Sequence, residues 1–231
     1  GSAYYAVYRY LLGDFEPYIY KTDNYGASWS RLTDGKNGIA ADNPTRVVRE
    51  DPGREGLLYA GTEFGMFISG DNGAHWQPFS LNLPQVPITD IKLHHKDLVI
   101  STQGRSMWIL DDVTPLHQIG QQTASSPAVL FKPRDAVRAR LGGGRGGFGG
   151  GGGGALPGQA QFPPYGATIN YYLGRAATGP VTIDILDAAG KTIRSYSSEG
   201  ATRAAAENAP APDADDEMPA FRRAAPPVRL T

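Results

Sequence analysis

One stretch of this sequence, Thr22-Asp23-Asn24-Tyr25-Gly26-Ala27-Ser28-Trp29, occurs again as Ser69-Gly70-Asp71-Asn72-Gly73-Ala74-His75-Trp76. The second copy begins 47 residues after the first, and the two align without a gap. A repeat of about 40–45 residues is the length that one four-stranded blade of a β-propeller needs. The two copies therefore predict consecutive propeller blades.

Both copies follow the Asp-box pattern Ser/Thr-x-Asp-x-Gly-x-x-Trp, whose chemistry is that of a tight turn. The Asp carboxylate can accept hydrogen bonds from N–H groups of its own turn, the Gly permits a left-handed backbone, and the Trp folds back over the blade edge. The second copy matches fully, whereas the first carries Asn in the Asp position. We expect structural roles for Thr22, Asn24, Gly26, Trp29, Ser69, Asp71, Gly73 and Trp76.

A weaker third copy follows the second. Residues 65–71 align with 106–112 at an offset of 41, and this copy keeps the aromatic residue and the final Asp but lacks the Gly and Trp. Around the copies, short β-branched or aromatic runs are bounded by Gly, Pro, Asn or Asp, as strands are. These runs cover 18–20, 45–48, 57–60, 66–68, 90–93, 98–101 and 107–110. Residues 1–115 are therefore predicted to be two to three terminal blades, the first beginning near its third strand.

Composition divides the rest of the chain. Residues 142–154 are nearly all Gly, and such a run cannot offset its ordering entropy. Strands are expected over 167–173, 181–186 and 192–197, with a hairpin turn at 187–191 and one buried face formed by Val181, Ile183 and Ile185. The predicted segments are a connector (116–141), a flexible linker (142–162), a small β-domain (163–198), a disordered Ala/Pro/acidic segment (199–227) and the start of a further strand (228–231).

The overall composition excludes several classes of partner. The 231 residues include 22 basic and 23 acidic side chains, so no net charge attracts nucleic acid or an acidic membrane surface. The longest apolar runs are far shorter than a membrane span. Cysteine is absent, which excludes disulfides and thiolate metal sites. We expect no nucleic-acid partner, no membrane span and no cofactor.

The chain resembles the large bacterial BNR-repeat (bacterial neuraminidase repeat) proteins with sortilin-type propellers, which are often labelled glycosyl hydrolases. The resemblance covers about residues 4–198 and is carried by stretches 17–22, 50–65, 101–112, 130–138 and 163–167. It implies an all-β chain, with a partial β-propeller followed by a partial, Ig-like β-sandwich. It also implies an internal segment of a longer, secreted or periplasmic protein. No catalytic residue is implied.

In such propellers the ligand site is expected on the face opposite the Asp boxes. That face is formed by loops between second and third strands, here 62–65 and 102–105, and by connections between blades, here 33–43 and 81–87. It would gather Glu63, Gln103 and Arg105, with Glu63 as an acid/base or ligand carboxylate and Arg105 as an anion binder. The alternative is a solvated pair of little energetic weight.

Two other features are expected to be structural. His94-His95 suggests a metal site, but neighbouring residues of a strand point to opposite faces, so we expect no shared ion. Tyr20, Phe67 and Trp108 occupy equivalent positions of the repeat and are expected in the core.

Two functions remain open. The first is a binding or scaffold segment that recognises glycan or peptide. The second is part of a glycoside hydrolase, sialidase-like or of another type, completed by missing blades. A glycosidase needs two carboxyls about 5–9 Å apart and a sialidase needs several arginines, but the loops supply only Glu63 and Arg105. The open blade edges also favour self-association or pairing with the missing remainder of a propeller.

Overall fold

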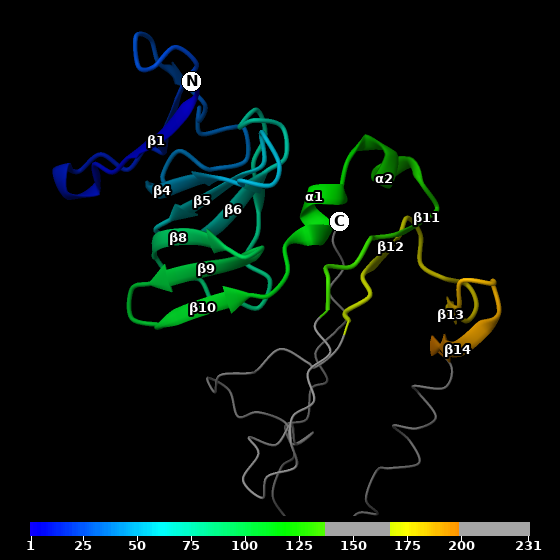
Figure 1. The fold of residues 1–231 in the computed structure, drawn as a ribbon. Helices are drawn as coiled ribbons and strands as arrows, with labels where there is room; N and C mark the ends of the chain where they lie inside the picture. The colour runs from blue at the N-terminus through cyan, green and yellow to red at the C-terminus, as the bar shows by residue number, and fades with distance from the viewer. Residues whose placement is uncertain (137–166, 199–231) are drawn as a thin grey trace, which may run out of the picture. The chain divides into compact units, whose positions relative to one another are not determined.

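The computed structural model describes residues 1–136 and 167–198 (Figure 1). They form β-strands in several small antiparallel sheets with few, short helices, which confirms the all-β prediction. The described residues form no closed propeller. The linker predicted at 142–162 and the segments predicted at 199–227 and 228–231 lie outside the described residues.

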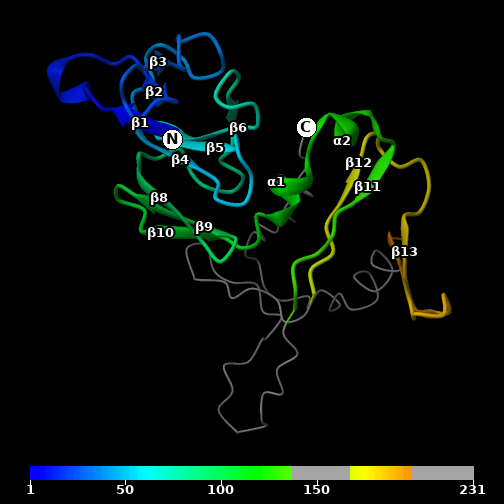
Figure 2. The same cartoon turned by 45° about the horizontal axis from the view of Figure 1, so that its top comes forward.

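The chain divides into two compact units, of which the first comprises residues 1–120 and 130–170 and the second 121–129 and 171–231. Three sheets build the first unit (Figures 1 and 2). The first sheet contains β1 (Ala3–Val7), β2 (Tyr18–Thr22) and β3 (Ser30–Arg31). The second contains β4 (Thr45–Glu50), β5 (Leu58–Thr62), β6 (Gly65–Ser69) and β7 (Gln77–Pro78). The third contains β8 (Ile88–His94), β9 (Asp97–Thr102) and β10 (Met107–Leu110).

The short helices lie outside the three sheets. A 3-10 turn, η1 (Tyr10–Leu12), lies between β1 and β2, and helix α1 (Thr114–Gln118) follows β10. Among the described residues, no helix is long and apolar enough to cross a membrane.

The first sheet begins one strand earlier than the sequence predicted. Strand β1 pairs with β2 in antiparallel register, from Ala3 opposite Thr22 to Val7 opposite Tyr18. The prediction missed β1 because residues 8–17 separate it from β2, whereas β5 and β6 are joined by a tight turn. Because this loop is longer, the distance along the chain from β1 to the first Asp box differs from that between β5 and the second box.

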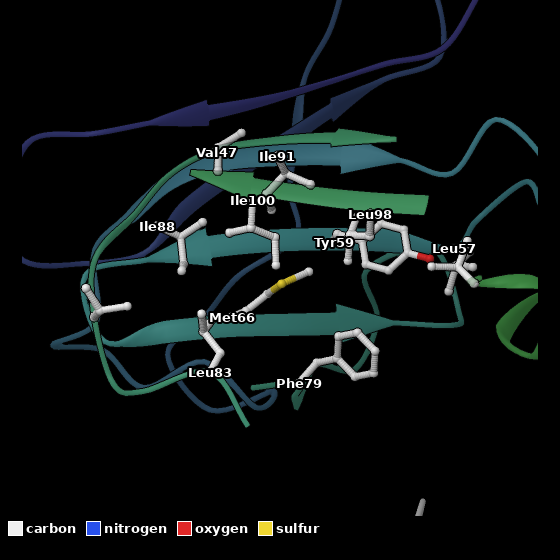
Figure 3. Close-up of a cluster of buried hydrophobic side chains, with 12 residues drawn as sticks. Val47, Leu57, Tyr59, Met66, Phe79, Leu83, Ile88, Ile91, Leu98 and Ile100 are labelled. Carbon is white, nitrogen blue, oxygen red and sulfur yellow. The ribbon is translucent and has the colours of Figure 1, made fainter. Parts of the chain in front are cut away.

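The main core lies between the second and third sheets (Figure 3). Gly61 of β5 permits their close approach, because a Cβ there would lie 2.6 Å from Ile88 and 2.7 Å from Val47. Each fully buried aliphatic side chain contributes about 1.5–3 kcal/mol. The buried members of this core are Val47, Leu57, Tyr59, Met66, Phe79, Leu83, Val86, Ile88, Ile91, Leu98, Ile100 and Val113.

A second core lies on the other face of the second sheet, because successive side chains of β4 and β5 point to opposite faces. Val47 and Tyr59 belong to the main core, whereas Val48, Leu58 and Ala60 belong to the second. All five residues of β5 are buried, as expected of a strand covered on both faces. The second core also contains Ile19, Ile39 and Trp76.

The second unit contains two two-stranded sheets. Helix α2 (Gln121–Ser125) precedes β11 (Ala128–Leu130), which pairs with β12 (Tyr171–Leu173). The other sheet is a hairpin of β13 (Thr182–Leu186) and β14 (Thr192–Ser197).

The hairpin turn of the second unit was predicted correctly, but its buried face was not. Gly190 has a φ of 82°, and the Asp187 carboxylate accepts the N–H groups of Ala189 and Lys191 at 2.9 Å. Ile183 is only half-buried, however, and Ile185 is 37% exposed. Alternation alone cannot bury a face unless a second layer covers it.

Candidate functional site

The two Asp-box turns have the same hydrogen bonds, atom for atom. In the second turn, Ser69 Oγ donates to Asp71 Oδ1 at 2.8 Å, and Asp71 Oδ1 accepts the His75 N–H at 2.9 Å. In the first turn, Thr22 Oγ1 and Asn24 Oδ1 make the corresponding bonds at 3.0 and 2.9 Å. The Asn amide oxygen therefore replaces the carboxylate oxygen as the acceptor of the turn.

A glycine with positive φ completes each turn, as predicted. The φ angles are 88° at Gly26 and 87° at Gly73, and each N–H donates at 2.9 Å to the hydroxyl of the first box residue. The other side-chain atom of this residue contacts the side chain four residues on in both boxes: Asn24 Nδ2 donates to Ser28 Oγ at 2.9 Å, and Asp71 Oδ2 lies 2.6 Å from Nδ1 of the exposed His75. Burial acts to raise the pKa of Asp71, but the hydrogen bonds from His75 and Ser69 outweigh it and lower the pKa below its ordinary value.

The two box tryptophans differ sharply in burial. Trp76 is 4% exposed and lies in the second core, whereas Trp29 is 48% exposed and contacts Tyr5 edge-on at 6.4 Å. The connection between the first and second sheets covers Trp76, since Asn37 O accepts the Trp76 N–H at 2.8 Å and Ile39 packs in the same core. This connection was expected on the opposite face, so the expectation is wrong for residues 37–39.

A polar cluster lies on that opposite face, at the loop between β5 and β6. We call it the Glu63 cluster; it consists of Tyr8, Arg46, Glu63 and Gln103. The Glu63 carboxylate contacts Arg46 Nε at 2.5 Å and accepts the Tyr8 hydroxyl at 2.5 Å, and its side chain is only 10% exposed. The Arg46 guanidinium also donates to Gln103 Oε1 at 3.2 Å and stacks over the Tyr8 ring at 4.6 Å.

A repeated backbone contact positions the two loops of this face. The Glu63 N–H donates to Pro44 O at 3.1 Å, and the Gln103 N–H donates to Pro87 O at 2.9 Å. Each proline immediately precedes the first strand of its own sheet. The repeat thus places Glu63 and Gln103 at equivalent positions of neighbouring sheets, and Arg46 bridges them.

The predicted partnership between Glu63 and Arg105 is not what the structure has. Arg105 is exposed, and its carbonyl accepts the Trp108 indole N–H at 2.9 Å. Arg46 pairs with Glu63 instead. The register of β4 against β5 shifts between Thr45 and Val47, and such a bulge re-aims the side chain of the extra residue.

Sequence reasoning missed Arg46 and Tyr8 for identifiable reasons. In the sequence, Arg46 is an ordinary residue of a predicted strand. Only the bulge in β4 directs its side chain toward Glu63 in the loop between β5 and β6. Tyr8 lies just after the undetected β1. Burial raises the pKa of Tyr8, with the hydrogen bond to Glu63 as the next cause. The neutral hydroxyl is therefore favoured as a donor, and Glu63 is held by two donors.

A second buried carboxylate, Asp51, was also missed. Its side chain is 1% exposed, and it accepts the Gly53 N–H at 2.7 Å and the Tyr59 hydroxyl at 3.0 Å. His117 Nε2 of α1 lies 2.9 Å from it. Burial, followed by the charge of Asp51, raises the pKa of Tyr59. We interpret this group as structural, because it joins α1 to the end of β4.

The two adjacent histidines do not point to opposite faces, so that prediction is wrong. Their ring centroids lie 4.1 Å apart, because β8 ends at His94 and His95 adopts a φ of 50° in the turn. In the part of the chain that the structure describes, no three His, Asp or Glu side chains are grouped so that they could hold a metal ion. The aromatics Tyr20, Phe67 and Trp108 lie on β2, β6 and β10 and are half-buried.

The chain matches no protein-family model, and it matches no curated protein.

Proposed function

We propose that this chain is a non-catalytic binding or scaffold segment of an extracellular BNR-repeat β-propeller protein. On this proposal the three sheets of the first unit are consecutive blades, and the second unit belongs to an Ig-like β-sandwich. The Glu63 cluster and the exposed loop 102–105 then form the surface offered to a glycan or peptide ligand. Gln103 and Arg105 are its ligand-contacting side chains.

The proposal rests on the ion pair and the hydrogen bond that Glu63 already makes within the chain. A general acid or base must exchange a proton with the substrate, and a glycosidase needs a second carboxyl across the bond. Glu63 is instead paired with Arg46 at 2.5 Å and bonded to Tyr8 at 2.5 Å, with most of its side chain removed from water. Each of these two partners is a donor, so the carboxylate is used to hold three segments together.

A sensitive assay for glycosidase activity tests the proposal against the hydrolase alternative. Aryl-glycosides and sialosides are incubated with the wild-type chain and with Glu63→Gln. We expect no turnover above background from either protein. Robust turnover by the wild type that disappears in Glu63→Gln, at unchanged melting temperature, would make the chain an enzyme and end the binding proposal.

Binding to glycan and peptide arrays provides the positive arm of the test. Gln103→Ala and Arg105→Ala remove exposed side chains, so both variants should keep the wild-type melting temperature and lose binding to any array ligand that the wild type retains. Lys36→Ala is the matched control, since Lys36 is exposed on the connection that covers Trp76. Equal loss of binding in Lys36→Ala would place the ligand elsewhere.

A further inference from the structure

One loop of the second sheet holds helix α1. This loop, residues 51–57, joins β4 to β5. Its Arg54 Nη1 donates to Leu116 O of the helix at 2.5 Å. Its Asp51 Oδ1 lies 2.9 Å from His117 Nε2, on the next helical residue. The chain leaves the first unit shortly after α1, so these two contacts dock the segment that leads into the second unit.

The loop is shaped to admit the imidazole. A Cβ at Gly53 would lie 2.7 Å from His117 Cε1, although Gly53 does not have a positive φ. The missing side chain therefore matches the position of the imidazole rather than a need of the backbone. The Gly53 N–H also donates to Asp51 Oδ1 at 2.7 Å, so the loop turns around the carboxylate that the imidazole meets.

The contact between Asp51 and His117 depends on charge. The Asp51 side chain is 1% exposed, and Nε2 of His117 is buried with no other hydrogen-bond partner among the described residues. A carboxylate removed from water is costly unless a counter-charge accompanies it. A protonated imidazole supplies that charge and a neutral imidazole does not. The guanidinium of Arg54, by contrast, is charged throughout the neutral range.

We propose that the Asp51–His117 contact makes the docking of α1 sensitive to pH: protonated His117 holds the helix against the loop, and neutral His117 holds it more weakly. The proton is taken up at Nε2, and no covalent bond changes. Because protonation favours the docked helix, docking is firmest below the ordinary imidazole pKa of about 6.5 and weakens as the pH rises above it. This inference goes beyond the proposed function and does not depend on which ligand the chain binds.

The other ionisable groups of the loop and of β5 do not reverse this direction. Arg54 opposes a second positive charge, but it bonds to a helix carbonyl, whereas Asp51 meets the imidazole directly. Burial, followed by the charge of Asp51, raises the pKa of Tyr59, so its hydroxyl remains a neutral donor to Asp51 Oδ2. Glu50 accepts a backbone N–H of the loop at 3.0 Å, and Glu55 is exposed.

The charged groups beside α1 itself have other partners or lie in water. Before the helix, Asp112 Oδ1 accepts the Thr114 hydroxyl at 2.6 Å. After it, Gln118 bonds to the backbone of Lys132, which is an exposed residue. Among the groups around this contact, His117 is therefore the one whose charge changes near neutral pH.

Amide hydrogen exchange in residues 113–119 tests the proposal on the full chain. Exchange is measured by mass spectrometry on either side of the ordinary imidazole pKa, at about pH 5.5 and about pH 8. Each rate is divided by the intrinsic rate of an unstructured peptide at the same pH. We expect about fivefold greater protection at the acidic pH, the difference between a charged and a neutral hydrogen bond. Protection in β5 serves as the internal reference.

Two histidine variants identify the titrating group. His117→Gln keeps a neutral N–H donor but cannot become charged. Its protection in α1 should match that of the wild type at the alkaline pH and should not rise at the acidic pH. His75→Gln is the matched control, because it removes the exposed histidine that pairs with Asp71 and should leave the pH dependence of α1 intact.

Two glycine variants test the contact while His117 stays in place. Gly53→Ala should push the imidazole away from Asp51 and abolish the pH dependence. Gly70→Ala is its control, since the nearest atom to the added Cβ would be 4.0 Å away, and it should keep the dependence. Equal protection of α1 at both pH values, greater protection at the alkaline pH, or a dependence that persists in His117→Gln or in Gly53→Ala would overturn the proposal.

Discussion

The two Asp boxes have the same turn but very different surroundings. Thr22–Trp29 and Ser69–Trp76 share every backbone and side-chain hydrogen bond of the motif, although one carries Asn24 and the other Asp71. Their tryptophans are 48% and 4% exposed. The turn is therefore determined by local residues alone, whereas the burial of the Trp depends on a connection supplied by the neighbouring sheet.

The covering connection explains the difference. Residues 37–39 lie over Trp76, and Asn37 also donates from its side chain to Gly73 O and Ala74 O of the same box. Trp29 has Tyr5 as its ring contact, and Tyr5 is itself 61% exposed. The tryptophan of an Asp box should therefore stabilise the fold more where a connection to the neighbouring sheet covers it.

The largest expected effect is that of removing the covered tryptophan. Trp76→Ala should lower the free energy of unfolding by about 3–5 kcal/mol, because it opens a cavity in the second core. Trp29→Ala, the matched change in the first box, should cost only about 1–2 kcal/mol because half of the ring is already in water. Urea denaturation of both variants measures the difference. Equal losses in the two variants would show that covering the indole ring does not contribute to the free energy of unfolding.

The connection itself can be disrupted at one glycine. Gly38 has a φ of +118°, and a Cβ there would collide with the backbone of Trp76. Gly38→Ala should therefore cost about 2–3 kcal/mol, from backbone strain and from displacement of the connection. Gly13→Ala is the control, since Gly13 has a φ of +76° but no atom within 4 Å of its added Cβ. It should cost about 1 kcal/mol.

Fluorescence of the tryptophans distinguishes displacement from simple strain. If Gly38→Ala moves the connection, the emission of Trp76 should shift toward that of a solvated indole, whereas Gly13→Ala should leave the spectrum unchanged. A stability loss in Gly38→Ala with an unchanged spectrum would show that residues 37–39 do not cover the ring as described.

The parts of the fold that the sequence predicted are those that depend on neighbouring residues. The box turns follow from hydroxyl, amide and carboxylate groups that bond to the backbone within a few residues. Most strands of the first unit follow from short apolar or β-branched runs between turn residues: β2, β4, β5, β6, β8, β9 and β10. The two-residue strands β3 and β7 are polar and were not predicted. The hairpin turn at Asp187 and Gly190 follows from the same local chemistry.

The parts that the sequence did not predict depend on distant contacts. The pairing of Glu63 with Arg46 needs the bulge in β4, and Tyr8 reaches the cluster only because β1 exists. The burial of Ile185 depends on a second layer, which alternation does not supply. The error at His95 has a different origin: β8 ends at His94, so His95 lies in the turn, where its positive φ brings its ring beside that of His94.

A smaller change in stability is expected when the hydrogen-bond acceptor of the second Asp box is replaced. Asp71→Ala removes the oxygen that accepts the His75 N–H and should cost about 1 kcal/mol. Asp71→Asn should cost less than about 0.5 kcal/mol, because Asn24 makes the same turn with an amide oxygen and the lost contact with His75 is exposed. Thermal unfolding of both variants checks the order. An equal loss in Asp71→Asn and Asp71→Ala would show that the charge, and not the acceptor oxygen, holds the turn.

The smallest effect is a difference in acid stability between the two boxes. The pKa of Asp71 is lowered in the folded chain, so its carboxylate stabilises the fold above its unfolded pKa of about 3.9. That contribution is lost as the pH falls through the lower, folded pKa. Asp71 is 45% exposed, so water screens the effect to well under 1 kcal/mol. Asp71→Asn should therefore remove this small contribution at neutral pH and flatten the fall in stability below about pH 4.

The first box offers the reciprocal change. Asn24→Asp places a carboxylate in a turn with the same N–H donor from Ser28, so it should add to the first box the acid dependence that Asp71→Asn removes from the second. Urea denaturation at several pH values between neutral and pH 3 measures both variants against the wild type. If Asn24→Asp leaves the acid limb unchanged while Asp71→Asn flattens it, the dependence arises from the contact between Asp71 and His75 rather than from the turn that the two boxes share.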